Sequence, residues 1–290
     1  MDPSGEVGEP NPPHEYTDVQ QYRNTSVEEI VDQLGPFEYG EDAEMRGNLE
    51  YRPLKLLDTG AQYEGEFIRG SQVREGKGKQ IWADGSIYEG YWSSNKANGK
   101  GRLIHADGDI YEGEWRDDKA DGYGIYRHLD GARYEGHWHE DRQHGKGVET
   151  WPDGAKYEGE YNMGKKHGHG IFKWSDGSSY TGDFNDNNIE GQGIYEWGDK
   201  RKFIGQWKDN KMHGEGEFFW PDGRKYKGQY KDDKKEGFGI FEWPDGGTYI
   251  GPWMDGKQHG VGTYINSKKK ERKGKWDHGK RIEWIKTEST

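Results

Sequence analysis

The feature that most constrains this chain is a repeat of 23 residues that begins at Tyr63. The aromatic residues that open the units are Tyr63, Tyr88, Tyr111, Tyr134, Tyr157, Tyr180, Phe203, Tyr226 and Tyr249, separated by one step of 25 residues and then seven steps of 23. A unit that restarts nine times forms a one-dimensional stack in which each unit contacts only its neighbours. The repeat therefore predicts a long binding surface rather than a catalytic pocket.

Within a unit, the side chains alternate as they do in half-buried β-strands. Tyr111, Gly113 and Trp115 share one face, whereas Glu112 and Glu114 share the other. A second segment with Gly-X-Gly follows about six polar residues later, for example after residues 116–121, and a tighter Trp-X-Asp-Gly turn leads back. Each unit is therefore expected to be a β-hairpin.

Nine hairpins in series predict an all-β fold. We expect an elongated, twisted meander of antiparallel β-hairpins that forms a single-layer ribbon, with about 18 strands over residues 63–265 and a length on the order of 85 Å. The two extra residues of the first unit are expected in the loop between Ile68 and Glu75, because an insertion within a strand would turn the following rings to the other face.

These residues resemble a known family. The segments Tyr111–Trp115 and Tyr157–Tyr161, with Gly-X-Gly and Asp-Gly at this spacing, are similar to MORN repeats (membrane occupation and recognition nexus). The resemblance covers nine units over residues 63–265 and a half unit at 272–276, so residues 63–276 are expected to form the array and 277–290 a tail. Lys200, where other units have the turn Gly, departs from the pattern. MORN arrays occur in radial spoke heads and other ciliary assemblies and beside lipid-kinase or methyltransferase domains, and some dimerise near their C-terminal repeats.

Composition and charge narrow the class of partner. There are no cysteines, and hydrophobic residues make up only 29% of the chain while aromatic residues make up 14%. Residues 1–62 hold 14 acidic and 4 basic side chains, a net charge of −10, so the other 228 residues carry only −2 of the total of −12. Nucleic acid is an improbable partner because the array has no basic stripe. The absence of thiols and of long apolar runs indicates an intracellular protein.

The segment before the repeats, residues 1–62, is expected to be an acidic arm. Its Pro-rich start, residues 1–24, is typical of a disordered or extended segment. Ser26 and Glu29 have the spacing of a capping box, so a short amphipathic helix is expected at 26–35. The apolar side of this helix, with Ile30 and Leu34, needs a surface, which is either the first hairpins or another protein. Residues 51–60 resemble a degenerate half repeat that adds a strand at the N-terminal edge.

A basic run marks the other end of the array. Its residues are Lys268, Lys269, Lys270, Arg272, Lys273 and Lys275, with Trp276 beside them and Trp284 further on. The half unit at 272–276 is expected to leave an open sheet edge that mates with a second copy or with a related repeat protein. Anionic lipid is the alternative partner for this run, and a solubilising cap is the plain interpretation.

No cofactor, metal or catalytic site is predicted. The Gly-X-Gly segments open strands, and the recurring His and Asp residues stand one per unit, too far apart to share an ion. We therefore expect a non-enzymatic scaffold or adaptor of a cytoskeletal assembly, and specifically of the ciliary axoneme. The alternative function is a peripheral adaptor at anionic phospholipid membranes.

Overall fold

The computed structural model describes residues 20–40 and 48–285, so the expectations for residues 1–19 and 286–290 lie outside the described part. The described chain forms one helix and a single sheet of 22 strands. The elements are α1 (Thr25–Leu34), β1 (Leu49–Leu56), β2 (Gln62–Ile68), β3 (Arg74–Ile81), β4 (Ile87–Ser93), β5 (Lys96–Ile104), β6 (Ile110–Arg116), β7 (Lys119–Arg127), β8 (Arg133–His139), β9 (Arg142–Thr150), β10 (Lys156–Asn162), β11 (Lys165–Lys173), β12 (Ser179–Asn185), β13 (Asn188–Glu196), β14 (Lys202–Lys208), β15 (Lys211–Phe219), β16 (Lys225–Lys231), β17 (Lys234–Glu242), β18 (Thr248–Met254), β19 (Lys257–Gln258), β20 (Gly260–Ile265), β21 (Glu271–Asp277) and β22 (Lys280–Trp284).

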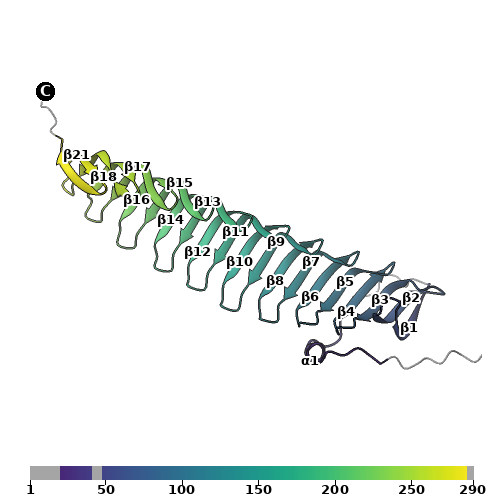
Figure 1. Cartoon of the computed structure of the whole chain (residues 1–290). Coiled ribbons are helices and arrows are strands. Elements are labelled where there is room, and N and C mark those ends of the chain that lie inside the picture. Colours follow the sequence, from purple (N-terminus) through teal and green to yellow (C-terminus); the bar gives the residue numbers. More distant parts are fainter. Residues whose placement is uncertain (1–19, 41–47, 286–290) are drawn as a thin grey trace, which may run out of the picture.

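The strands follow one another along the ribbon in chain order, and neighbouring strands are antiparallel (Figure 1). Residues 62–265 hold β2 to β20, in which β19 and β20 are one strand interrupted at His259 and both pair with β18. The expected meander of hairpins in a single layer is confirmed. Below, the repeat units are numbered 1 to 9 from the aromatic residues that open them, Tyr63 to Tyr249.

The turns differ in length from the sequence-based expectation. The connection expected to span residues 116–121 is a two-residue turn, Asp117–Asp118, because β6 continues to Arg116 and β7 begins at Lys119. Both turn residues have positive φ, 50° and 69°, which is the type I′ geometry that matches strand twist. The Trp-X-Asp-Gly connection is the longer one, since five residues, 151–155, separate β9 from β10. Residues 116–121 therefore comprise the end of β6, a tight turn and the start of β7.

A β-bulge recurs within the units and accounts for the Gly-X-Gly pattern. Between β6 and β7, Gly113 is opposite Gly124 whereas Trp115 is opposite Ala120, so β7 has two more residues than β6 in this stretch. Gly122 lies in the bulge with a φ of 113°, which disfavours any residue with a Cβ. The bulge lets Gly124 and Ala120 face the same side as Trp115.

Both ends of the sheet carry added strands. The insertion in unit 1 lies in the loop at residues 69–73, as expected. At the N-terminal edge, β1 pairs with β2, and residues 57–60 form the same turn hydrogen bonds as Trp82 to Gly85. At the C-terminal edge the expectation was wrong: the half unit at 272–276 is not the open edge, because β22 pairs with it. The edge is the five-residue strand β22 itself.

The expected helix is present, with a different cap. α1 runs from Thr25 to Leu34, and its N-cap is Asn24, whose side chain accepts hydrogen bonds from the backbone N–H groups of Ser26 and Val27. Ser26 is therefore a residue of the first turn and not the cap. Gly35, with a φ of 72°, ends the helix and donates its N–H to the carbonyl of Val31.

Candidate interaction surfaces

The sheet has two unlike faces, and the first, called the ring face here, carries the opening aromatic residues. Tyr134 shows the arrangement: its ring lies over two glycines, since a Cβ added at Gly136 or Gly147 would come within 2.7 Å or 2.4 Å of the tyrosine oxygen. The Tyr134 hydroxyl donates to the carbonyl of His137 at 2.9 Å. Trp138 and Tyr161 contact the same ring edge to face, with centroids 5.1 Å and 5.2 Å away. These contacts make a core without a second layer.

The opening rings are among the most buried side chains of residues 20–40 and 48–285. Tyr63, Tyr157, Tyr180, Phe203 and Tyr249 are fully buried. Burial raises the pKa of these tyrosines above the usual value of 10, and for Tyr249 to about 12. They are neutral packing groups at physiological pH and offer no acid or base for chemistry.

A second line of rings on the same face is mostly half buried, and only its members Phe218 and Phe241, each 7% exposed, are buried. Phe172 stacks on Trp174 with centroids 4.5 Å apart, and Trp174 contacts Tyr195 at 5.2 Å. The line continues from unit to unit through Trp197, Phe218, Trp220, Phe241, Trp243 and Tyr264. Half-buried rings of this kind can pack against a partner without disturbing the core beneath them.

Two lysines insert their ammonium groups among these rings. Lys235 Nζ lies 5.0 to 5.2 Å from the ring centroids of Trp220, Tyr226, Phe241 and Trp253. Burial, with a further contribution from Arg224, lowers the Lys235 pKa to about 8. Lys166 lies in the same way over Tyr157, Tyr161 and Phe172 of unit 5 and over Trp151 of unit 4, with its Nζ 5.0 Å from the Trp151 centroid. It also donates to the Glu149 carboxylate at 2.9 Å. The ring face therefore has room for a lysine side chain between its rings at this position, and for Lys235 the contacts with the rings do not fully offset the cost of burying the charge.

The opposite side of the sheet, called the back face, is covered by α1 over units 1 and 2. Val27 is fully buried there, with Ile30 and Val31 beside it. The sheet contributes four isoleucines to this contact: Ile81, Ile87, Ile104 and Ile110. Later units have polar residues at most of these positions, such as Arg127, Arg133, Thr150 and Lys156. This difference in the sequence distinguishes the covered units from the others, and none of the predictions above used it.

Hydrogen bonds pin the segment around α1 to the sheet. The Asn24 side-chain amide donates to the carbonyls of Asp84 and Ala106, which belong to two successive turns. Gln62 joins the backbone of residues 20 and 22 through its side-chain oxygen and nitrogen. After the helix, Tyr39 contacts Tyr91 edge to face with centroids 5.5 Å apart. Residues 20–40 thus show how a polypeptide segment fits the back face.

The back face beyond these units is not covered by described residues. Ile171, Ile194 and Ile204 are exposed at 38 to 39%. They lie in one row across strands β11 to β14, in which Ile171 is opposite Thr181, Thr181 is opposite Ile194, and Ile194 is opposite Ile204. A groove of about 470 Å³ over units 3 to 5 adjoins this row and is lined by Tyr123, His137 and Ile171 among others. These side chains form an apolar strip on an otherwise polar surface.

The predicted partner residues on the helix divide into one covered and one exposed side chain. Ile30 packs against the isoleucines of the sheet and is half buried. Leu34 is 40% exposed. The helix was expected to pack either on the first hairpins or on another protein, and in the structure it packs on the first hairpins.

The basic residues near the C-terminus do not form one surface. Lys268, Lys269 and Lys270 are exposed in the turn between β20 and β21, whereas Lys273 and Lys275 lie on the back face. Arg272 lies on the ring face, and its guanidinium is 5.6 Å from the Trp284 ring.

Trp276 was predicted to contact a partner, but its side chain is buried. Only 6% of Trp276 is exposed, because its ring packs against Tyr249 with centroids 4.9 Å apart and against Trp284 at 6.0 Å. Trp284, on the edge strand β22, is half buried. Trp276 therefore belongs to the core, and Trp284 remains the accessible ring at this end.

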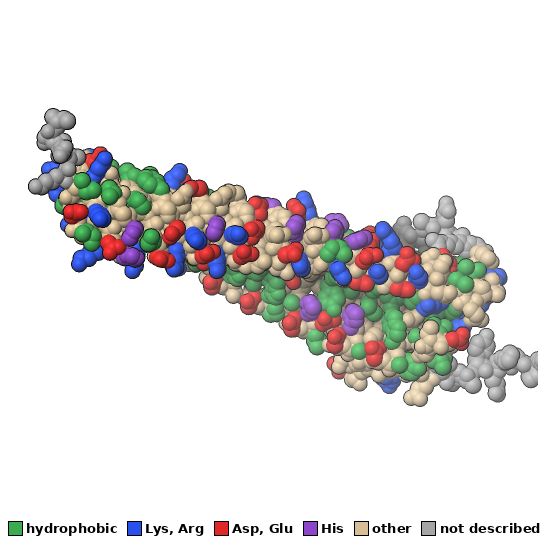
Figure 2. All heavy atoms as spheres, turned by 45° about the horizontal axis from the view of Figure 1, so that its top comes forward, with side chains coloured by type: hydrophobic (Ala, Val, Ile, Leu, Met, Phe, Trp, Pro, Cys, Tyr) green, Lys and Arg blue, Asp and Glu red, His purple; other side chains and the backbone are tan. Residues whose placement is uncertain are grey.

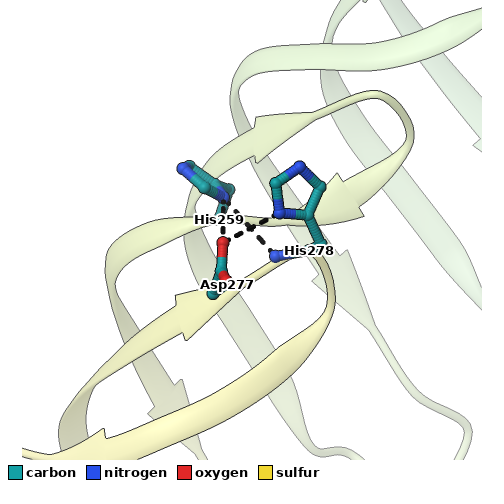
Figure 3. Close-up of side chains that lie close together, drawn as sticks. All are labelled: His259, Asp277 and His278. Atoms are coloured by element: carbon teal, nitrogen blue, oxygen red, sulfur yellow. Dashed lines mark hydrogen bonds and ion pairs between the residues drawn. The ribbon is translucent and has the colours of Figure 1, made fainter.

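One cluster has the donor atoms of a metal site. His259 Nδ1 lies 3.4 Å from Asp277 Oδ1, and His278 Nδ1 lies 2.8 Å from the same oxygen (Figure 3). His259 Nδ1 also accepts the backbone N–H of His278 at 3.4 Å. Other units have the same contact with other acceptors: Glu190 accepts from Asp209 N and Glu236 from Asp255 N, both at 3.0 Å. The arrangement is therefore explained by turn capping.

Charge is mixed over the face drawn in Figure 2. Acidic and basic side chains alternate over the visible face without a stripe of one sign (Figure 2). No helix among residues 20–40 and 48–285 combines the length and apolarity that crossing a membrane requires.

Comparison with known families identifies the array. The MORN repeat model matches nine times, at residues 63–87, 88–110, 111–133, 134–156, 157–179, 180–200, 203–223, 226–248 and 249–268. The chain therefore belongs to the MORN-repeat family. Among curated protein sequences there is no match.

Solved structures give only distant likenesses. The SAS-4 (dCPAP) TCP domain of Drosophila melanogaster, in complex with a proline-rich motif of Ana2 (dSTIL), is 10% identical with a TM-score of 0.34, covering 68% of this chain and 99% of that one. The G-box domain of the microcephaly protein CPAP is 13% identical with a TM-score of 0.28, covering 68% and 97%. The TCP10 domain of Danio rerio CPAP is 13% identical with a TM-score of 0.24, covering 81% and 100%. TM-scores this low relate neither the fold nor the function of those proteins to this chain.

Proposed function

We propose that this protein is a non-enzymatic scaffold that binds protein partners along its sheet within a cytoskeletal assembly. One observation carries the proposal: the back face is covered by the chain's own residues 20–40 over units 1 and 2, and the same face exposes Ile171, Ile194 and Ile204 further along. A face that already packs a helix at one end is suited to pack another polypeptide where its aliphatic residues are uncovered.

The chemistry of the surfaces supports binding over catalysis. The buried tyrosines have raised pKa values and point into the core. The His and Asp groups that come together at His259 serve a turn contact that other units make without histidine. A nucleophile beside a base in a closed pocket, which acyl or phosphoryl transfer needs, is not among the described residues.

We propose the ciliary axoneme as the assembly. This proposal rests on the resemblance to MORN arrays in radial spoke heads and other ciliary assemblies. The partners proposed are proteins of that complex, including a second copy or a related MORN protein that mates with the short edge strand β22. Ile282, exposed at 55% on that strand, would lie in the contact. Sedimentation of the full chain beside an Ile282→Glu variant tests self-association, which is refuted when both sediment as monomers.

The alternative function is peripheral binding to anionic membranes. One observation favours it: Lys268, Lys269 and Lys270 are exposed together in one turn. A polybasic segment contributes about 1 kcal/mol per lysine or arginine near an anionic surface. The other basic residues of this end lie on two faces, and the whole chain carries a net charge of −12, so attraction to lipid would be confined to this turn.

Two experiments separate these functions. The tagged full chain is purified from ciliated cells and its associated proteins are identified by mass spectrometry, and the purified chain is floated with phosphoinositide liposomes. The scaffold proposal predicts recovery of axonemal proteins at stoichiometric amounts and no flotation at physiological salt. Flotation that disappears on replacing the three lysines with Gln, together with no stoichiometric partner, would establish the membrane function instead.

A further inference from the structure

The repeat allows one position to be compared across units on the ring face. The position lies opposite the second ring of each unit: Ala97 faces Trp92, Lys166 faces Tyr161 and Lys235 faces Tyr230. It is occupied by Arg74, Ala97, Ala120, Gln143, Lys166, Ile189, Met212, Lys235, Gln258 and Arg281 in successive units. Long side chains fill the space between the rings in most units, whereas alanine leaves it open.

The opening is measurable at Ala97. A cavity of about 330 Å³ lies there, lined by Trp82, Tyr88, Leu103 and Trp115. These residues are the equivalents, six units earlier, of Trp220, Tyr226, Phe241 and Trp253, which surround the Lys235 ammonium at 5.0 to 5.2 Å. Three of the four rings are retained, so the cavity has the walls of the lysine cage without the lysine.

The mouth of the cavity carries a charge that the Lys235 cage does not have. Asp118 lines the cavity, and its Oδ1 accepts the backbone N–H of Ala97 at 2.7 Å. The residue at the corresponding place in unit 8 is Gly256. A carboxylate at this place favours a cation, because it offsets the cost of removing an ammonium group from water.

The other charge in the wall belongs to Arg74. Its guanidinium lies 4.3 Å from the centroid of the Trp92 ring and is hydrogen-bonded to Gln80 and Asn95. Arg74 therefore has hydrogen-bond partners of its own, and it shares the cavity wall and the Asp118 charge with a bound cation, which would lie among Trp82, Tyr88 and Trp115.

We propose that the cavity at Ala97 is a binding site for a lysine side chain of a partner protein, which would place its ammonium among Trp82, Tyr88 and Trp115 and beside Asp118. The occupant is inferred from Lys235 and Lys166, which show that this fold holds a lysine ammonium between these rings. This inference rests on the proposed protein-binding function, and it specifies that a lysine side chain of the partner makes one of the contacts.

The test uses the full chain with selectively ¹⁵N-labelled tryptophan indoles and a single-residue probe, N-acetyl-lysine N-methylamide. Its neutral control is N-acetyl-norleucine N-methylamide, which has the same aliphatic length without the ammonium. We expect the lysine probe, at millimolar concentration, to shift the Trp82 and Trp115 signals and to bind at least threefold more tightly than the norleucine probe, as a cation over aromatic rings should.

The control variants carry at position 97 residues that occupy the equivalent position in other units. Ala97→Lys and Ala97→Met place in unit 2 the residues found in units 8 and 7, so both should fold, fill the cavity and abolish the shifts. Lys235→Ala should open a second site and add shifts at Trp220 and Trp253.

Three results would overturn the proposal: no shifts with either probe, equal binding of both probes, or shifts that persist in the two filled variants. Because no partner protein is used, these outcomes are independent of the purification that tests the proposed function. Probe binding without recovered partners would refute the scaffold alone, and recovered partners without probe binding would refute the lysine site alone.

Discussion

Replacing Trp138 with Ala tests whether the rings on the ring face are a true core. The Trp138 side chain donates its indole N–H to the carbonyl of Gly124 at 3.2 Å. Its ring contacts Tyr134 and Tyr111 edge to face, with centroids 5.1 Å and 5.2 Å apart. It joins the two halves of the ring face, since it packs against both buried clusters.

The expected cost follows from these contacts. The hydrogen bond contributes about 1 kcal/mol, each aromatic pair about 0.5 to 1.5 kcal/mol, and the rest comes from lost burial. A large-to-small change of a core aromatic costs about 3 to 5 kcal/mol. Since Trp138 is half buried, we expect a loss of about 3 kcal/mol in the free energy of unfolding.

Trp138→Tyr is the matched control, because Tyr161 and Tyr230 occupy the same position in other units. It should lose about 1 kcal/mol, the contribution of the indole hydrogen bond. Urea denaturation followed by circular dichroism gives both free energies, and hydrogen exchange locates the damage. Since units contact only their neighbours, exchange should accelerate in β6 to β9 and remain unchanged in β16 to β18. Unchanged stability of Trp138→Ala, or acceleration along the whole array, would refute the reasoning.

Three further changes test other parts of the structure. Lys200 has a φ of 71°, a conformation that favours glycine, so Lys200→Gly should raise the free energy of unfolding by about 1 kcal/mol while Lys200→Ala should not. Thermal denaturation that shows no gain for the Gly variant would argue against strain at this turn. Gly147→Ala places a Cβ 2.4 to 2.6 Å from Tyr134 ring atoms and should cost about 1 to 3 kcal/mol in urea denaturation, whereas a neutral result would mean that the ring can move aside. The pKa of Lys235 is lowered to about 8, so between pH 8 and 10.5 the unfolded state binds more protons than the folded state and the free energy of unfolding rises with pH. The wild type should therefore gain stability over this pH range relative to Lys235→Met. Parallel pH profiles of the two proteins would contradict the lowered pKa.

The fold could be predicted because the repeat restates it nine times. The alternation of Tyr111, Gly113 and Trp115 against Glu112 and Glu114 indicated strands, and the parity argument placed the insertion of unit 1 in a loop. The turn lengths were wrong because Asp117 and Asp118 lie among polar residues that look like a loop. Their positive φ values and the two-residue type I′ turn have no signature as plain as Asn-Gly.

The interaction surfaces were less predictable, because they depend on contacts between distant segments. Ile30 was predicted to lie on the apolar side of a helix. The sheet surface that it contacts, formed by Ile81, Ile87, Ile104 and Ile110, can be found only when the back-face positions of successive units are aligned. Trp276 was assigned to a partner because an incomplete unit suggested an open edge, whereas β22 covers it. The basic run was contiguous in sequence, yet alternation in β21 sends Arg272 and Lys273 to opposite faces.

The most direct test of the central claim is whether the uncovered part of the back face binds the partners. The variant carries Ile171→Glu, Ile194→Glu and Ile204→Glu. The control carries the same number of added carboxylates at the exposed second residue of three Trp-X-Asp-Gly turns, Pro152→Glu, Ser175→Glu and Pro221→Glu. Both are expressed in ciliated cells beside the wild type, checked for equal thermal stability, and purified with their partners for quantitative mass spectrometry. The account predicts that the isoleucine variant loses at least tenfold in recovery of stoichiometric partners while the control retains them. Equal recovery with wild type and isoleucine variant would contradict it.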